Sequence, residues 1–281
     1  TSFTSWNFIG CTADLLKDQG INILLNITFG PIINAARGIA YTVNRAVIGF
    51  ASNFMTALSP QITKNYASGD REYTFSLVER GARFCFYIMF ILSLPLWLEA
   101  DTILTLWLKQ YPDHTVNFVR LVLVLSLSEI LSSTLMYLQL ATGKIRNYQL
   151  IIGSITLLNF PFSYATLKLG CPPESPLVIA IVISTLCMMI RLVLLKRTAG
   201  LSIRSFIKNV YINIIYVAIL SSIIPLAIHT MMDEGWLRMI VTSCTSVIAS
   251  CIIILFFGCN HEERVFILGK IPIIKHRFRH S

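Results

Sequence analysis

The sequence predicts an all-α membrane protein, a polytopic bundle of about eight transmembrane helices. Its residues are 55% hydrophobic and only 13% charged, with a mean hydropathy of +0.69. A soluble domain carries about 25% charged residues. The apolar residues also gather into segments long enough to cross a bilayer as helices, with short polar turns between them.

Eight apolar segments follow one another, roughly at residues 4–30, 34–58, 76–98, 116–141, 147–168, 175–195, 209–231 and 236–258. The first is the least apolar, because Asp14, Lys17 and Asp18 interrupt it, and Gly30-Pro31 makes the turn into the second. Proline removes a backbone hydrogen bond, so kinks are expected where it falls inside a segment: at Pro95 (or a simple break near a helix end there), Pro161 and Pro225.

The second segment, 34–58, places two arginines inside an apolar run. On a helical wheel of about 100° per residue, its polar residues fall on one side: Asn34, Arg37, Tyr41, Asn44, Arg45 and Ser52. An arginine near the centre of a membrane helix costs roughly 2.5–3.5 kcal/mol, and each Ile, Val or Phe returns only about 0.3–0.6 kcal/mol. We therefore expect lipid on the apolar side of this helix and a hydrated cavity, shared with Lys17, on the other.

Other acids in the membrane segments offer a structural alternative. Asp14 lies three residues before Lys17, close enough to pair on a helix, and Asp18 follows on the same broad side. These acids can also pair with the arginines of the second segment, as buried charges usually do. Glu129 is the single acid within residues 116–141, and a satisfied acid in the bundle interior is its plainest interpretation.

The basic residues orient the bundle. Of the 23 Lys and Arg, sixteen fall in the turns and ends on the side of the first residue. Three lie within the membrane segments, and four fall on the opposite side: Lys109, Arg120, Lys168 and Arg238. Because cytoplasmic loops carry the excess of Lys and Arg, both termini are expected in the cytoplasm.

The turns are short, and the longest, residues 99–116, contains an expected interfacial turn with Trp107 as an anchor. No loop forms a separate catalytic domain, and no HExxH, GxSxG, Walker A or DxD motif occurs, which disfavours a membrane glycosyltransferase or ligase. The cysteines show no metal-binding spacing, so we expect neither a cofactor nor a metal. Residues 259–281 form a basic tail suited to anionic membrane lipids rather than to nucleic acid.

Two stretches carry a resemblance to a known family. They are Gly30-Pro-Ile-Ile-Asn-Ala-Ala-Arg-Gly-Ile-Ala-Tyr41 and Phe54-Met-Thr-Ala-Leu-Ser-Pro-Gln-Ile-Thr-Lys-Asn-Tyr-Ala-Ser-Gly-Asp70. They resemble the polysaccharide-type flippases of the multidrug/oligosaccharidyl-lipid/polysaccharide exporter superfamily, in which the second pattern is a cytoplasmic loop. Leu106-Trp-Leu108 and Ala141-Thr-Gly-Lys144 fit the same pattern, and the resemblance extends over most of residues 6–195.

The resemblance implies a C-terminal six-helix lobe at residues 1–198, two additional helices at 199–258, and an N-terminal lobe upstream of Thr1. It implies transport of lipid-linked oligosaccharide across the inner membrane for polysaccharide synthesis, with O-antigen of lipopolysaccharide as the model, and no enzymatic activity. A pyrophosphate headgroup would then meet Arg37, Arg45 and Lys17, and sugar hydroxyls would meet Asn34, Tyr41 and Asn44. Asp14, Asp18 and Glu129 would pair charges or couple a cation. A cation-coupled exporter of small molecules in the same superfamily is the alternative.

The charge asymmetry leads to a testable topology. In a variant without native cysteines, a single cysteine beside Arg279 should resist a membrane-impermeant thiol reagent in intact cells and react after permeabilisation. Labelling of this position in intact cells would contradict the predicted orientation.

Overall fold

The computed structural model describes residues 2–270, with side chains described for Leu15 and from Lys17 to Val265. Within this part every regular element is a helix, and no strand occurs. In chain order the helices are α1 (Ser2–Phe29), α2 (Pro31–Ala67), α3 (Arg71–Leu98), α4 (Ala100–Leu108), α5 (Thr115–Ala141), α6 (Arg146–Leu157), α7 (Asn159–Lys168), α8 (Ser175–Thr198), α9 (Ile203–Phe206), the π-helix η1 (Ile207–Ile212), α10 (Asn213–Met231), α11 (Trp236–Ile253), the π-helix η2 (Ile254–Gly258) and α12 (His261–Lys270).

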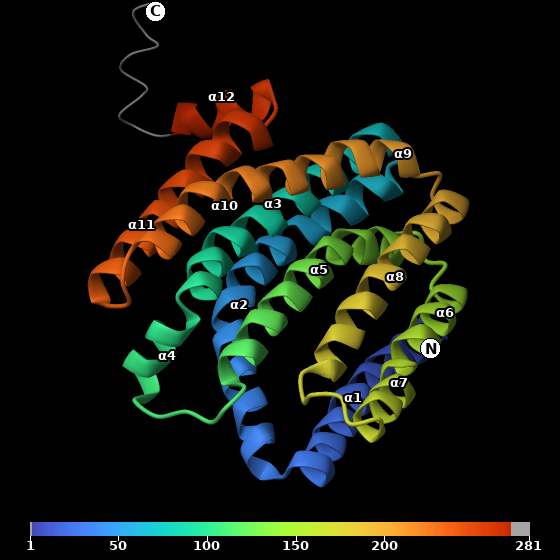
Figure 1. Cartoon of the computed structure of the whole chain (residues 1–281). Helices are drawn as coiled ribbons and strands as arrows, with labels where there is room; N and C mark the ends of the chain where they lie inside the picture. The colour runs from blue at the N-terminus through green and yellow to red at the C-terminus, as the bar shows by residue number, and fades with distance from the viewer. Residues whose placement is uncertain (1, 271–281) are drawn as a thin grey trace, which may run out of the picture.

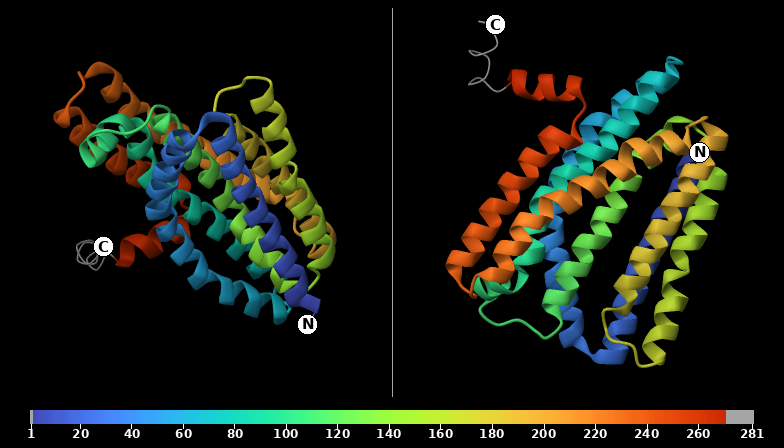
Figure 2. Two further views of the ribbon diagram at one scale, coloured as in Figure 1. Left: turned by 90° about the horizontal axis from the view of Figure 1, so that it is seen from below. Right: turned by 45° about the horizontal axis from the view of Figure 1, so that its top comes forward.

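The long helices run up and down, each antiparallel to the next (Figures 1 and 2). One end of the bundle, here named the basic end, holds the turns α2–α3, α5–α6, α8–α9 and η2–α12. The turns α1–α2, α7–α8 and α10–α11, together with α4, lie at the opposite end. All eight apolar segments of the sequence form helices. Because successive helices alternate in direction, the turns whose lysines and arginines predict the cytoplasmic side lie together at the basic end.

Helix α2 packs against α5, α3 and α1. Small residues let its neighbours approach: a Cβ added to Gly81 of α3 would lie 2.3 Å from the Leu58 side chain of α2. Ala36 and Val47, expected on a lipid face, are instead buried against neighbouring helices, whereas Phe50 is exposed. The apolar side of α2 is therefore mostly a packing surface, because an alanine-rich face supports close helix contacts.

Glycine and proline set several boundaries. Gly30 adopts a positive φ of 84° between α1 and α2, and Pro31 begins α2, where its missing N–H is not needed. The bound of residue 58 for the second segment is too early: α2 continues through Pro60 to Ala67, so most of the pattern at residues 60–70 expected as a loop is helical. Near Pro161 the chain does break into α6 and α7, at Leu158.

Six stretches among the described residues are long and apolar enough to cross a membrane: Arg71–Leu98, Thr115–Ala141, Arg146–Lys168, Ser175–Thr198, Ile203–Met231 and Trp236–Gly258. Helices α1 and α2 are not among them, because charged and amide side chains interrupt their apolar runs. The expected count of about eight is thus supported for six helices only.

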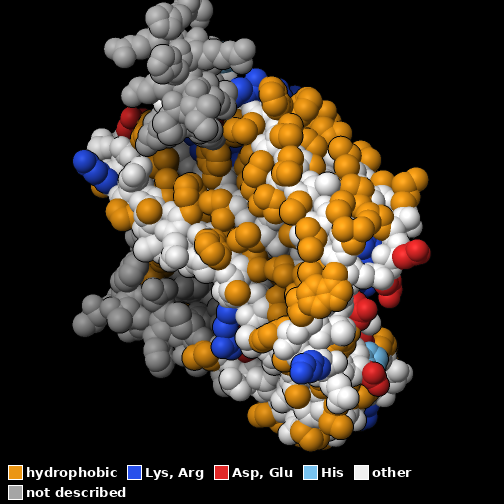
Figure 3. Space-filling model, turned by 90° about the vertical axis from the view of Figure 1, so that its left-hand side faces the viewer, with side chains coloured by type: hydrophobic (Ala, Val, Ile, Leu, Met, Phe, Trp, Pro, Cys, Tyr) orange, Lys and Arg blue, Asp and Glu red, His pale blue; other side chains and the backbone are white. Residues whose placement is uncertain are grey.

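The hairpin of α10 and α11 packs against α3 and covers one side of the bundle. Its outer surface is rich in exposed apolar side chains, visible as a broad hydrophobic face in Figure 3. Examples along the two helices are Ile215, Ile219, Ile223, Ile240, Ile248 and Ile252. An extended apolar face of this kind suits contact with lipid.

At the opposite end a buried ion cluster ties this hairpin to α3. The carboxylate of Glu99, which directly follows α3, is fully buried and lies 2.8 Å from Nδ1 of His229 in α10 and 3.3 Å from Nε of Arg238 in α11. At the basic end, Arg83 of α3 lies 2.6 Å from Glu263 of α12. The middle of α3 and the residue that directly follows it are therefore both joined to the C-terminal helices by buried charge pairs.

Arg238→Gln should lower the free energy of unfolding by about 3–5 kcal/mol, because it leaves the Glu99 charge buried without its guanidinium partner. The matched control is Glu234→Gln: Glu234 also lies near Arg238, at 3.9 Å, but its side chain is 81% exposed. Such a surface pair is worth about 0–1 kcal/mol. Unfolding in detergent measures both changes, and equal stability of the two variants would contradict the assignment.

The difference in stability between wild type and Arg238→Gln should also depend on pH. Burial alone would raise the pKa of Glu99, but the hydrogen bond with His229 and the charge of Arg238 hold that pKa below its ordinary value of 4.5. A lowered pKa stabilises the fold above that value, and this stabilisation is lost as the pH falls through the folded pKa. The difference between wild type and Arg238→Gln should therefore shrink below pH 4.5.

Candidate functional site

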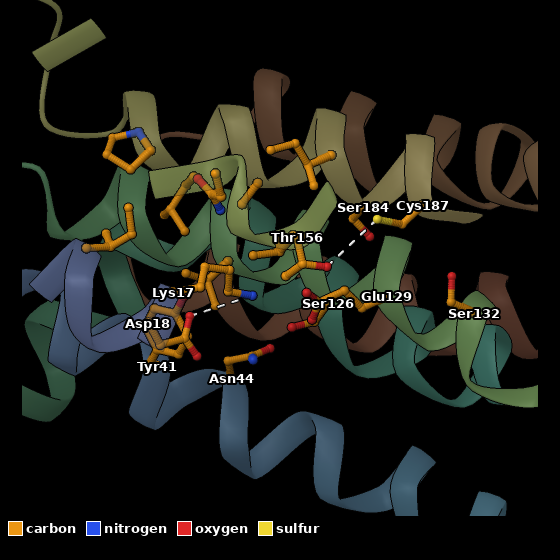
Figure 4. A pocket seen from close by; sticks show the side chains of 18 of the residues that line it. Lys17, Asp18, Tyr41, Asn44, Ser126, Glu129, Ser132, Thr156, Ser184 and Cys187 are labelled. Carbon is orange, nitrogen blue, oxygen red and sulfur yellow. Dashed lines mark hydrogen bonds and ion pairs between the residues drawn. The ribbon is translucent and has the colours of Figure 1, made fainter. Parts of the chain in front are cut away.

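The polar stripe of α2 faces a cavity of about 360 Å³, bordered by α1, α2, α5, α6, α7 and α8 (Figure 4). Its wall is mixed. Apolar groups come mainly from α5 and α8, such as Val122 and Ile183. The polar and charged members come from every bordering helix: Lys17, Asp18, Arg37, Tyr41, Asn44, Ser126, Glu129, Ser132, Thr156, Asn159, Ser184 and Arg191.

Arg37 is the buried cation of this wall, with only 6% of its surface exposed. One guanidinium nitrogen donates to Oδ1 of Asn22 in α1, and another donates to the hydroxyl of Tyr41 at 3.2 Å. Tyr41 lies one helical turn further along α2, so its ring also stacks under the guanidinium at 4.6 Å. Among the described side chains no carboxylate lies within ion-pair distance of Arg37, and its charge remains available to an anion.

Both signs of charge meet in the cavity. Lys17 and Asp18 of α1 form an ion pair with a 3.7 Å separation, and Glu129 projects from α5 (Figure 4). Arg191 enters from α8. Three cations therefore oppose two carboxylates, and the formal charge of the wall is positive by one. A wall of net positive charge attracts an anion more than a cation.

A second hollow of about 460 Å³ adjoins the first and holds Arg45. It is bordered also by Asn22 and Asn34, and it shares Asp18, Arg37 and Tyr41 with the first cavity. The sequence suggests that Arg45 meets Lys17 in one cavity, but the structure separates them. Arg45 is exposed, because it lies one position past Asn44 and turns to the edge of the polar stripe.

Several buried polar atoms of the first cavity have no hydrogen-bond partner among the described residues. They are Nε of Arg37, Oδ1 of Asn44, Oγ of Ser132 and Nε of Arg191. Leaving a buried donor or acceptor unpaired costs about 1–3 kcal/mol. Water or the polar groups of a ligand satisfy such atoms, so this wall is suited to a hydrated or polar occupant.

The sequence analysis identifies part of this wall and misses another part. Lys17, Asp18, Arg37, Tyr41, Asn44 and Glu129 all border it, whereas the Asp14 side chain lies outside the described residues. Arg191 was counted with the cytoplasmic basic residues. The apolar run 192–195 that separates it from Lys196 is the signal that it belongs inside the helix. The three-residue spacing of Ser126, Glu129 and Ser132 is a similar signal on α5.

Comparison with known proteins adds no identity: no protein-family model, curated protein or solved structure matches the chain. Within the described residues no group of three or more His, Cys, Asp or Glu side chains is arranged to hold a metal ion. The fold and the site together define a class, a helical bundle of membrane-spanning composition with a polar cavity of mixed charge.

A hydrated cavity predicts different reactivity on two sides of α8. Ser184 borders the cavity, whereas Val182 faces outward and is 63% exposed on the apolar surface. With the other cysteines removed and the protein in lipid, Ser184→Cys should react with a water-soluble thiol reagent at least about tenfold faster than Val182→Cys, because only a hydrated thiol ionises to the reactive thiolate. Equal rates would show that the cavity is dry.

Proposed function

We propose that the chain is the C-terminal lobe of a polysaccharide-type flippase, which moves a lipid-linked oligosaccharide across the inner membrane for cell-surface polysaccharide synthesis. The observation that carries this proposal is Arg37: a buried guanidinium on a cavity wall, held by neutral partners and without a carboxylate in ion-pair range among the described side chains. A polyprenyl-pyrophosphate sugar offers an anionic headgroup to such a site.

The chemistry of the wall suits the two parts of that headgroup. Arginine presents a planar fork of donors that matches phosphate oxygens, and Arg37 keeps Nε free of other hydrogen bonds among the described residues. Asn44, Asn159 and the serine hydroxyls offer donors and acceptors to sugar hydroxyl groups. The apolar outer surface of the bundle suits the prenyl chain, which stays in lipid.

In the proposed architecture α1 and α2 also cross the membrane with their polar stripes turned to the cavity, giving about eight spans. Residues 1–198 form the six-helix lobe, residues 199–258 add two helices, and the basic end faces the cytoplasm with both termini. Transport then requires the N-terminal lobe, with the two lobes rocking about the headgroup. The tail, 259–281, contributes binding to anionic lipids.

A cation-coupled exporter of the same superfamily is the second candidate, and Asp18 and Glu129 favour it. Both carboxylates border the cavity that contains Arg37. Carboxylates in a membrane cavity are suited to bind protons or metal cations during transport. In that case neutralising Glu129 should abolish export, whereas neutralising Arg37 should change only its affinity for substrate.

The proposal predicts a specific pattern of export in cells that depend on the full-length protein. Arg37→Gln should reduce polymer export roughly 10- to 150-fold, the loss expected when a charge-assisted contact of about 1.5–3 kcal/mol is removed. Arg37→Lys should keep part of the activity, since a point charge still attracts phosphate without the bidentate geometry. Arg45→Gln should have a smaller effect, because Arg45 is exposed in the adjoining hollow.

Lys196→Gln is the matched control, an exposed cation of α8 outside the cavity wall. Protein level in the membrane must be measured with export, because a structural role for Arg37 would lower both together. Full export by a well-expressed variant lacking both Arg37 and Arg45 would reject the pyrophosphate site.

A further inference from the structure

The cavity is elongated along the bundle axis. On α8 its wall extends from Pro176 to Arg191, which are about 22 Å apart at 1.5 Å per residue. Figure 4 shows the same extension, with Asp18 and Tyr41 towards one end and Ser132 and Cys187 towards the other. A ligand group can therefore occupy different depths in one continuous space.

The two arginines of the cavity lie at different depths. Arg37 follows the start of α2 at the opposite end by six residues, or about 9 Å. Arg191 follows the start of α8 at that same end by sixteen residues, or about 24 Å, so it lies nearer the basic end. Lys17 of α1 lies between them, about 18 Å from Phe29 at the opposite end.

Arg191 has the properties of an anion contact in its own right. Its guanidinium stacks on the ring of Tyr148 at 5.8 Å, which holds it against α6. Its buried Nε has no hydrogen-bond partner among the described residues, and neither has Oγ of Ser132. Ser132 lies at a matching depth, about 25 Å from the start of α5. A cation and a hydroxyl at one level form a minimal phosphate contact.

We infer that Arg191 and Ser132 form a second contact for a phosphate or pyrophosphate group, nearer the basic end of the cavity than Arg37. The inference rests on the proposed function for the identity of the natural ligand. A headgroup entering from the basic end meets Arg191 first and Arg37 last, with the Lys17–Asp18 pair between them. Because the charges of Lys17 and Asp18 neutralise each other, this pair binds the headgroup only weakly at the middle depth.

Cys187 is a native reporter for this contact. It borders the cavity one helical turn before Arg191, on the same face of α8. With the other six cysteines replaced and the chain in lipid nanodiscs, modification of Cys187 is timed with an anionic and a cationic methanethiosulfonate. Each rate is divided by the rate of the same reagent with a free thiol in solution, and all rates compared here are these relative rates. The anionic reagent should have the higher relative rate in wild type, and Arg191→Gln should reduce the ratio of the two on the order of tenfold.

Inorganic pyrophosphate supplies the second measurement. It should slow the modification of Cys187 in wild type and in Arg191→Lys, and it should have no effect in Arg191→Gln. Arg197→Gln is the matched control, because Arg197 is an exposed cation of the same helix outside the cavity wall. Protection that survives in Arg191→Gln, or an Arg197→Gln effect of equal size, would overturn the inference.

Two results obtained with both Cys187 and Arg191 unchanged also test the inference, and neither requires a substitution in the cavity that could impair folding. Failure to react with either reagent would show that ions do not reach this depth, and equal rates for the two reagents would show no anion preference. If pyrophosphate protects Cys187 through Arg191 while the Arg37 and Arg45 variants export polymer normally, the anion contact at Arg191 is supported and the flippase function is rejected. If Arg37→Gln loses export but Arg191→Gln does not change the modification of Cys187, the flippase function is supported and the contact at Arg191 is rejected.

Discussion

An ionised side chain inside an apolar helical bundle requires polar surroundings, and much of this structure follows from that constraint. Arg83 and Arg238 meet it in the same way, each against a buried carboxylate that consumes its charge. Arg37 meets it differently, through an amide, a hydroxyl and an aromatic ring. In the first arrangement the two charges neutralise each other, and the pair stabilises the fold. The second leaves a charge on a cavity wall, which is why the cavity, rather than either end, is the candidate site.

Helix α2 makes both arrangements compatible because its two sides have different chemistry. Ala36, Ala40 and Ala51 allow close packing with the neighbouring helices, which excludes water from that side. The other side carries the polar groups that line the cavity, and Arg37 among them reaches Asn22 of α1. A polar wall and a packed core thus belong to one continuous helix, and displacement of α2 would change both.

The helical segments were predictable from hydrophobic periodicity because each is long and bounded by glycine, proline or charge. The polar stripe of α2 followed from the wheel, including the positions of Arg37, Tyr41 and Asn44. The depth and neighbours of Arg45 did not, since they depend on how α1 and α2 pack. Arg191 was missed because a count of loop charges treats an arginine near a helix end as part of the turn. At Pro60 the sequence pattern suggests that the helix has ended, but α2 continues through this proline, because a membrane-type helix tolerates proline where other groups satisfy the freed carbonyl.

The contacts between α3 and the C-terminal hairpin have a mechanical consequence. Glu99 binds both helices of the hairpin just after α3 ends, and midway along α3 the hydroxyl of Tyr87 donates to the carbonyl of Gly258 at 3.2 Å, close to the Arg83–Glu263 pair. These contacts, together with the packing of both hairpin helices on α3, join α3, α10 and α11 into one connected layer. The cavity lies among other helices, α1, α2, α5, α6, α7 and α8, so a movement that widened it would change the packing of α1 on α2 and of α8 on α5 rather than that of the hairpin on α3.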